Sequence, residues 1–312
     1  MTPEQIAELR QKNYNATVVW INKFHSDLVR LHVKPDKPLR PHQPGQYTSL
    51  GLGYWEPRIE GCQVEALKPG EESKVVRRAY SIGCAMLDEK GAGLAADAAT
   101  AGWLEFYIVL VRDKEGPEAP ALTPRLFLLK EGDRLNMVEK ITGHFTAEPV
   151  KDGDAVLFLS TGTGEAPHNY MLWELLRRGH KGRILAACCV RYKRDLAYLA
   201  IHEELMRRYK NYTFLSLTTR EADTVKHKVY IQDLITSGQL ADILGQPVKP
   251  EKMHVYLCGN PKMIGVPSKD KETGARTYPK PLGVIEILEN MGFKADNPTI
   301  KFTGNIHFEE YW

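Results

Sequence analysis

Short hydrophobic runs, separated by proline, glycine and aspartate, occupy the chain from Asn15 to Glu139. They are rich in β-branched and aromatic residues and too short for typical helices, so they predict strands. The runs are Thr17–Ile21, Leu28–Val33, Gln46–Leu50, Val75–Ile82 and Trp103–Val111. A short helix is predicted at Pro124–Leu129, because proline suits a first helical turn. This half of the chain therefore predicts an antiparallel β-barrel.

The pattern changes after Glu148–Asp154, a polar segment that predicts a linker between two domains, 1–150 and 151–312. Beyond it, apolar runs alternate with stretches of helical spacing. The apolar runs are Ala155–Leu159, Ile184–Val190, Thr213–Leu217 and His254–Leu257, and the helical stretches are Asn169–Arg178, Tyr198–Lys210 and Leu282–Met291. Such alternation predicts an α/β domain with a doubly wound parallel sheet. Ligands bind these sheets where strands end and helices begin.

Two segments interrupt this scheme. Gly83–Gly102 is rich in alanine and glycine and has little to bury, so we expect it on the surface. Pro267–Pro281 is rich in charge, glycine and proline and predicts an exposed loop.

Composition excludes several classes of protein. The formal net charge of +3 argues against a general nucleic-acid binder. No apolar run approaches the roughly 20 residues of a membrane span, and Met1–Asn15 lacks the apolar stretch of a secretory signal, so we expect a cytoplasmic protein. The five cysteines include no C-x-x-C pair, and the fourth residue after His202 is Met206 and not a second histidine. No metal site is therefore expected.

The first candidate for chemistry is Arg78-Ala79-Tyr80-Ser81, within a predicted strand. Alternation places Arg78 and Tyr80 on one face, so a guanidinium stands beside an aromatic ring. A flavin nucleotide needs both, because its phosphate favours a charged fork and its planar ring favours a stacking surface. The alternative is a solvated arginine on an ordinary strand.

The second candidate is the glycine-rich segment Ser160–Pro167, which follows an apolar strand and precedes a helix. Its glycines allow a pyrophosphate to approach the backbone closely, and the amides of the following helical turn can face an anion. It is not a Walker loop, because no Gly-Lys-Ser/Thr follows. The alternative is a tight strand-to-helix turn without a ligand.

Two further segments follow strands. In Cys258-Gly259-Asn260-Pro261, the glycine admits a flat ring and Cys258 offers a small, soft wall, while Asn260 can instead cap the next helix. No activating base for a catalytic thiol is visible near Cys258 in the sequence. In Thr218-Thr219-Arg220-Glu221, the arginine favours NADP over NAD, because it suits the 2′-phosphate. Lys226 and Lys228 can add positive charge.

Together, in this order, these motifs resemble the ferredoxin–NADP reductase family, in particular its bacterial ferredoxin/flavodoxin reductase branch. The resemblance covers nearly the whole chain. It includes Pro44–Tyr47, Glu105–Tyr107, Leu122–Leu126, Val190–Tyr192, Asp195–Tyr198 and the terminal Glu310-Tyr311-Trp312.

The resemblance implies a two-domain enzyme that binds FAD and NADP(H) and exchanges electrons with ferredoxin or flavodoxin. It implies that Arg78 holds the FAD phosphate, that Tyr80 stacks on the isoalloxazine, and that Ser81 lies near the flavin N5 that exchanges hydride. Cys258 would lie beside the reacting nicotinamide, so the catalytic set is Tyr80, Ser81 and Cys258. Further FAD contacts are implied at Ala79, Tyr107, Ala121, Leu122, Thr123, Thr142, Gly143, Thr163, Tyr311 and Trp312. The NADP contacts are Gly162, Thr163, Gly164, Arg191, Thr219, Arg220, Lys228, Cys258, Gly259 and Asn260.

The chain departs from the family pattern at Val229-Tyr230, where relatives carry Gly-Arg, so one expected 2′-phosphate contact is missing. The segments Gly83–Gly102 and Pro267–Pro281 are a second departure and bear on which protein docks. Two alternatives stay open at this point. One is an NAD(P)H-dependent reductase component that serves an oxygenase or another acceptor. The other is a non-catalytic binding module without flavin.

Overall fold

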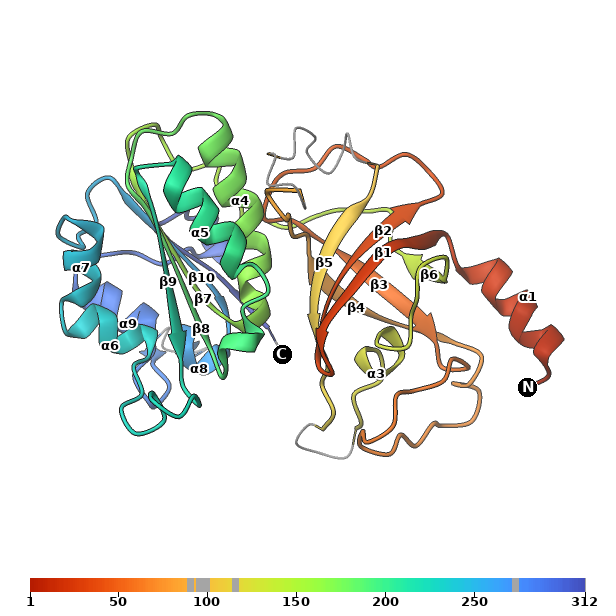
Figure 1. Ribbon diagram of the computed structural model, residues 1–312. Coiled ribbons are helices and arrows are strands. Elements are labelled where there is room, and N and C mark those ends of the chain that lie inside the picture. The colour runs from red at the N-terminus through yellow and green to blue at the C-terminus, as the bar shows by residue number, and fades with distance from the viewer. Residues whose placement is uncertain (89–92, 94–101, 114–117, 271–274, 312) are drawn as a thin grey trace. The chain divides into compact units, whose positions relative to one another are not determined.

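The computed structural model of the protein describes residues 1–88, 93, 102–113, 118–270 and 275–311 (Figure 1). They form two compact units, Met1–Ala85 with Gly93–His144, and Phe145–Trp312 with Met86–Ala92. The assignment of separate functions to 1–150 and 151–312 stays a prediction. Across the described part of the chain, no helix is long and apolar enough to cross a membrane.

The first unit is built on an antiparallel sheet that has six strands within the described residues, in the order β4-β3-β6-β1-β2-β5. The strands are β1 (Ala16–His25), β2 (Leu28–Pro35), β3 (Tyr47–Gly53), β4 (Val75–Ser81), β5 (Leu104–Val109) and β6 (Arg134–Met137). The two outer strands meet where the Gly83 amide donates to the Glu105 carbonyl at 2.8 Å. The sheet thus curls into the predicted barrel-like form, around buried side chains such as Val18, Leu31 and Phe106.

Two helices accompany this sheet, α1 (Pro3–Asn13) and α3 (Thr123–Leu126). Helix α1 was not predicted, because none of its side chains is buried and its sequence carries no apolar stripe. Its first turn is capped by Thr2 and Gln5, which bond to each other's backbone amides. Its last residue is fixed by Asn136, whose side-chain amide donates to the Asn13 carbonyl at 2.6 Å.

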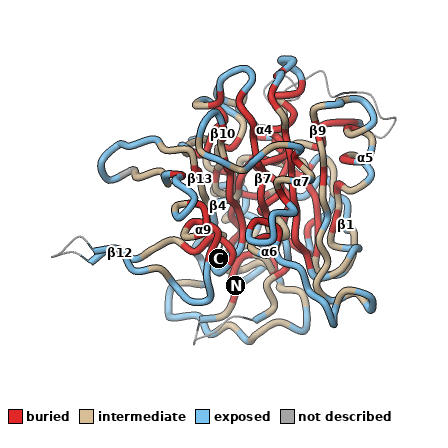
Figure 2. Tube along the Cα trace, turned by 90° about the vertical axis from the view of Figure 1, so that its left-hand side faces the viewer, coloured by how far each residue is buried: buried red, intermediate tan, exposed pale blue. Residues whose placement is uncertain are grey.

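The second unit contains a parallel sheet, in which the described residues form five strands in the order β13-β10-β7-β8-β9. The strands are β7 (Ala155–Thr161), β8 (Ile184–Val190), β9 (Tyr212–Thr218), β10 (Met253–Gly259) and β13 (Ile306–Glu310). All residues of β8 are buried, as are all but the last of β7, because helices cover both faces. Figure 2 shows this buried centre in red.

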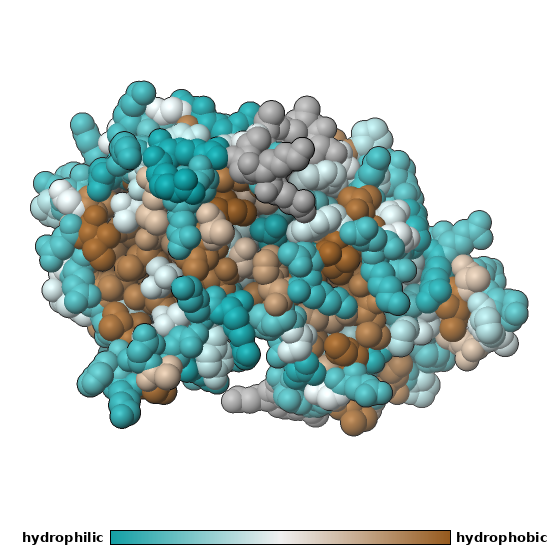
Figure 3. Space-filling view, viewed as in Figure 1, coloured by the Kyte–Doolittle hydropathy of each residue, from teal (hydrophilic) through white to brown (hydrophobic). Residues whose placement is uncertain are grey.

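The helices of this unit are α4 (Glu165–Arg177), α5 (Leu199–Arg208), α6 (Ile231–Thr236), α7 (Gln239–Leu244), α8 (Pro261–Ile264) and α9 (Val284–Asn290). Helices α6 to α9 pack against one face through Leu157, Leu185 and Val255, and α4 and α5 cover the other. This is the predicted doubly wound arrangement (Figure 1). Strand β9 ends the sheet, and hydrophobic side chains gather on the surface of this part of the unit (Figure 3).

The two interrupting segments behave differently. Ala85, Met86 and Leu87 are buried, so the expected surface position of Gly83–Gly102 is wrong at this end, whereas 89–92 and 94–101 lie outside the described residues. The segment Pro267–Pro281 forms a small hairpin of β11 (Ser268–Lys269) and β12 (Arg276–Thr277), whose four residues are exposed (Figure 2). Its residues 271–274 are not described.

Candidate functional site

The order of the parallel strands reverses beside β7. From β7 the chain proceeds outward to β8 and β9, and it then returns to place β10 on the other side of β7. The segments after β7 and β10 therefore meet at the carboxyl edge of the sheet. In open α/β sheets this topological switch point is where ligands bind. The structure brings the two predicted glycine segments together there, although they are far apart in the sequence.

These two segments pack backbone against backbone. A Cβ atom on Gly164 would lie 2.3 Å from the Cys258 carbonyl oxygen, and one on Gly259 would lie 2.3 Å from the Thr161 hydroxyl oxygen. The Asn260 amide also donates to the Thr161 hydroxyl at 2.7 Å. Gly164 and Gly259 are thus required by the packing of the loops themselves.

Gly162 differs from these two glycines. It has a φ of +52°, and no atom lies within 4 Å of where its Cβ would be. Gly162, Thr163 and Gly164 form a single 3-10 turn that leads directly into α4. Helix α4 therefore begins at Glu165, four residues earlier than predicted. The turn presents open backbone at a helix N-terminus, where anions are favoured.

The end of β10 carries a neutral thiol. Cys258 is fully buried, and burial raises the pKa of its thiol well above the usual value, so it does not form a thiolate near neutral pH. Asn260 caps α8, since its side-chain oxygen accepts from the Lys262 amide at 2.8 Å. Asn260 therefore caps the next helix, which was the alternative role given to it in the sequence analysis.

The chain terminus lies beside the same strand end. The Tyr311 amide donates to the Gly259 carbonyl at 2.9 Å, and Glu310 pairs with Gly259 in the sheet. Trp312 lies outside the described residues.

Two arginines follow the ends of β8 and β9, and neither side chain has an acidic partner among the described residues. Arg191 follows β8, and the Arg220 amide, beyond β9, donates to the Arg191 carbonyl at 2.8 Å. Both side chains are exposed, as is Lys228, and none of the three forms an ion pair with a described residue. Thr219 lies between the strand end and Arg220, with its hydroxyl 3.2 Å from the Val190 carbonyl.

In the first unit, the first candidate motif, Arg78–Ser81, lies on β4, at the edge of the sheet. Arg78 and Ala79 are exposed, Tyr80 is half-buried and Ser81 is buried. The Arg78 guanidinium donates to the Arg77 carbonyl at 2.8 Å and forms no ion pair with any described residue. Burial raises the pKa of the Tyr80 phenol, so the ring stays neutral. An unpaired guanidinium and a neutral ring therefore lie two residues apart on one open strand.

The other residues implied for the flavin lie around this strand. Thr142 exchanges two backbone hydrogen bonds with Tyr47, which pairs with Ser81, so Thr142 and Gly143 lie beside the end of β4. Ala121 and Leu122 are buried and directly precede α3, which begins at Thr123. Tyr107 is buried on β5, paired with Arg30.

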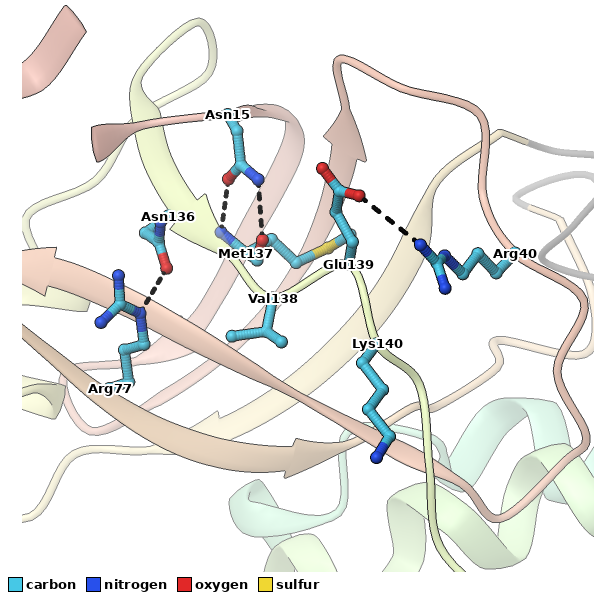
Figure 4. Close-up of a pocket in the computed structure, with 8 residues that line it drawn as sticks. All are labelled: Asn15, Arg40, Arg77, Asn136, Met137, Val138, Glu139 and Lys140. Atoms are coloured by element: carbon cyan, nitrogen blue, oxygen red, sulfur yellow. Dashed lines mark hydrogen bonds and ion pairs between the residues drawn. The ribbon is translucent and has the colours of Figure 1, made fainter. Parts of the chain in front are cut away.

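A charged hollow of about 670 Å³ adjoins β4 on the same unit (Figure 4). Its lining residues are Asn15, Arg40, Arg77, Asn136, Met137, Val138, Glu139 and Lys140. Arg77 crosses over Gly51 to donate to the Asn136 side chain at 2.7 Å, and Asn15 bonds the Met137 backbone through both its amide atoms. The lining thus holds three cations against the single carboxylate of Glu139.

Sequence reasoning missed one buried polar group beneath the glycine turn. Glu165, the first residue of α4, lies 2.7 Å from His202, which in turn lies 2.7 Å from the Tyr212 hydroxyl. All three side chains are buried. The failed zinc motif at His202 was the only sequence signal, and no group of three or more metal-ligating residues occurs in the described ranges.

Known proteins resemble this chain in sequence and in fold. The family model for the oxidoreductase NAD-binding domain matches residues 158–269. The flavodoxin/ferredoxin–NADP reductase of Shigella flexneri is 31% identical over 228 residues, which cover 73% of this chain and 77% of that protein. The protein of the same name from Escherichia coli (strain K12) is 30% identical with the same coverage. A ferredoxin NADP+ reductase from Neisseria gonorrhoeae, solved with bound FAD and NADP, has 21% identity and a TM-score of 0.65, covering 96% of this chain and 98% of that one. This last likeness confirms the fold.

Proposed function

Since this chain belongs to the flavodoxin/ferredoxin–NADP reductase family, we propose that it transfers electrons between NADP(H) and a ferredoxin or flavodoxin, with FAD as its bound cofactor. It is an oxidoreductase, as the resemblance of its motifs predicted. The observation that carries the proposal is the switch point at β7 and β10, where open glycine backbone stands near arginines without acidic partners. Such a site is suited to the phosphates and the flat ring of a nicotinamide nucleotide.

The residues of β4 fit FAD. An exposed guanidinium that no described carboxylate neutralises suits a phosphate, and we assign this contact to Arg78. Tyr80 offers its neutral ring for stacking on the isoalloxazine, with Ser81 beside the flavin N5. Ala79 and the group Tyr107, Ala121, Leu122, Thr123, Thr142 and Gly143 complete the proposed seat. When bound, FAD supplies the redox chemistry, because a flavin takes up hydride at N5 and releases electrons singly.

The second unit supplies the nucleotide site. Gly162, Thr163 and Gly164 would meet the nicotinamide end, with Thr163 also reaching the flavin, and Cys258, Gly259 and Asn260 would form the facing wall. Because burial keeps the Cys258 thiol neutral, its proposed role is to shape the wall rather than to act as a nucleophile. Arg191, Thr219, Arg220 and Lys228 would bind the phosphates, and the three cations of this group form no ion pair with a described residue, which supports the assignment. Tyr311 and Trp312 are the proposed aromatic cover of the flavin.

The charged hollow beside β4 is our proposed docking surface for the electron carrier. Three of its lining residues are cations, and Arg77 is the direct neighbour of Arg78. An acidic carrier bound there would lie close to the strand that we assign to FAD, and opposite charges would speed its approach.

Substitution of Arg78 by alanine tests the FAD assignment. The wild-type protein should be yellow, and anaerobic NADPH should bleach its flavin absorbance. Arg78→Ala should lose most of its FAD on purification, because a charged hydrogen bond to phosphate contributes roughly 1.5–3 kcal/mol, or at least about tenfold in affinity. The absorbance ratio at the flavin and protein maxima measures this loss.

Arg77→Ala is the matched control, because the Arg77 side chain bonds Asn136 instead. It should keep its FAD. A colourless wild-type protein that FAD cannot reconstitute would contradict the proposal and favour a non-catalytic module. Reduction of an oxygenase component in preference to ferredoxin or flavodoxin would overturn the carrier assignment alone.

A further inference from the structure

A buried chain of polar side chains joins three elements of the second unit. Glu165 is the first residue of α4, His202 lies on α5 and Tyr212 begins β9. The His202 Nε2 atom lies 2.7 Å from Glu165 Oε1, and the His202 Nδ1 atom lies 2.7 Å from the Tyr212 hydroxyl oxygen. The imidazole also stacks on Phe214, with ring centroids 3.9 Å apart. The imidazole is thus held in one orientation by both nitrogens and by its face.

Water cannot replace these contacts readily, because the members are almost completely buried. Residue exposure is 3% for Glu165, 0% for His202 and 3% for Tyr212. Burial raises the pKa of the Tyr212 phenol well above its usual value, and the charge of Glu165 adds to the rise, so the hydroxyl keeps its proton. The Glu165 Oε2 atom is buried and has no hydrogen-bond partner among the described residues. The position of the carboxylate therefore depends on His202.

The chain of polar side chains formed by Glu165, His202 and Tyr212 ends directly beneath the glycine turn. Glu165 follows Gly164 in the sequence, and its backbone amide donates to the Gly162 carbonyl. The Cys188 thiol also reaches that carbonyl, at 3.8 Å. From the other end of the chain, β9 leads from Tyr212 to Thr219 and Arg220. The polar chain therefore links the turn assigned to the nicotinamide with the strand assigned to the 2′-phosphate.

We propose that Glu165, His202 and Tyr212 are positioning residues that hold the Gly162–Gly164 turn in the orientation that binds NADP(H). This inference rests on the proposed function of that turn. Without His202, the buried Glu165 carboxylate would lose the hydrogen bond that holds it, and burial of an unpaired carboxylate is costly, so it would move and displace the turn that precedes it. The polar chain thus acts on nucleotide affinity, while the main residues proposed to hold FAD, Arg78, Tyr80 and Ser81, lie on β4 of the first unit.

The experiment compares NADPH binding to the FAD-loaded protein by titration, and flavin reduction by stopped flow. His202→Leu, which leaves no donor for Glu165, should raise the Kd for NADPH about tenfold or more, which corresponds to the loss of one charged hydrogen bond. The rate of flavin reduction at saturating NADPH and the FAD content should stay within about twofold of the wild type, because the three side chains are buried beneath the turn and are not among the residues proposed to contact either cofactor. Tyr212→Phe, which removes one hydroxyl, should raise the Kd about threefold.

A double variant distinguishes an effect on the orientation of the Gly162–Gly164 turn from a general loss of protein stability. The double variant Glu165→Gln with His202→Gln places two amides, which can bond each other without an unpaired charge, so its Kd should return to within about threefold of the wild type. The matched control is Asp296→Asn, which changes the other 2.7 Å His–carboxylate contact of this unit, His307 with Asp296. His307 lies near the opposite end of its strand, so this variant should lower the melting temperature and leave the Kd unchanged.

The following outcomes decide whether the polar chain positions the turn. A Kd for His202→Leu within twofold of the wild type would overturn the inference, and so would a double variant no better than His202→Leu. If His202→Leu fails to fold, Tyr212→Phe and the double variant still give the answer. If the wild-type protein itself bound no NADPH, the proposed function would be wrong as well, whereas normal wild-type binding with unaffected variants contradicts this inference alone.

Discussion

At the scale of single residues, the proposed function depends on charged side chains that have no counter-charge among the described residues. Arg78, Arg191 and Arg220 are exposed and form no ion pair with a described residue. Most of the described arginines that are buried or half-buried, such as Arg125 with Glu65, are paired. Arg125 thereby fixes the chain around α3 and has no free capacity for a ligand. Unpaired guanidinium groups are the ones that can bind phosphate.

Arg220 should decide between NADPH and NADH. Arg220→Ala should raise the KM for NADPH about tenfold or more and leave that for NADH nearly unchanged, because only NADPH carries a 2′-phosphate and a charged hydrogen bond contributes roughly 1.5–3 kcal/mol. Steady-state kinetics with both nucleotides measure this. Arg194→Ala is the matched control, since the exposed Arg194 guanidinium lies over the Tyr192 ring. Equal losses for both nucleotides would rule out the 2′-phosphate role.

At the scale of elements, the junction of β7 and β10 sets the shape of the proposed nucleotide site. Gly259→Ala should lower the free energy of unfolding by at least about 2 kcal/mol, because the new methyl would meet the Thr161 hydroxyl in a tightly packed loop and the residue has a positive φ. The φ is +123° and the clash distance is 2.3 Å. Denaturant titration measures the change.

Gly238→Ala distinguishes backbone strain from the packing clash expected in Gly259→Ala. Gly238 also has a positive φ, +82°, but nothing lies within 4 Å of its Cβ position. Only backbone strain remains there, so the expected loss is about 1 kcal/mol. A Gly259→Ala protein as stable as Gly238→Ala would show that the two loops separate more easily than their packing indicates.

At the scale of the whole molecule, charge is distributed unevenly. The chain has a formal net charge of only +3, yet the hollow beside β4 holds Arg40, Arg77 and Lys140 against Glu139. The Glu139 carboxylate is also paired with Lys37 at 2.7 Å, which leaves the hollow positive. A local field of this kind speeds association with an acidic partner and is screened by salt.

Reduction of the carrier should therefore depend on salt. Between about 50 and 500 mM NaCl, kcat/KM for ferredoxin or flavodoxin should fall about tenfold, while reduction of a small neutral dye should change less than about twofold. Arg40→Gln should lower the carrier rate at low salt, whereas Arg207→Gln, which removes an exposed cation of α5 paired with Glu204, should not. The same salt dependence for carrier and dye would contradict electrostatic docking.

The sequence alone determined the local features of this protein. The apolar runs of β1 to β5 and β7 to β10 lie close to their predicted positions, because hydrophobic periodicity reports the burial of one segment at a time. It could not reveal β6 or β13, which are short or partly polar, nor α1, which buries no side chain. The glycine motifs were also recognised from the sequence alone. Their order along the chain identified the family.

Tertiary structure alone decided which of these segments meet. The pairing of Ser160 with Cys258 creates the switch point, and it joins residues that are nearly a hundred positions apart. The same holds for Glu165, which reads as an ordinary surface acid of a first helical turn until the fold brings His202 against it. Strand order and the burial of polar groups arise from contacts between distant residues, and a local pattern carries no record of its partner.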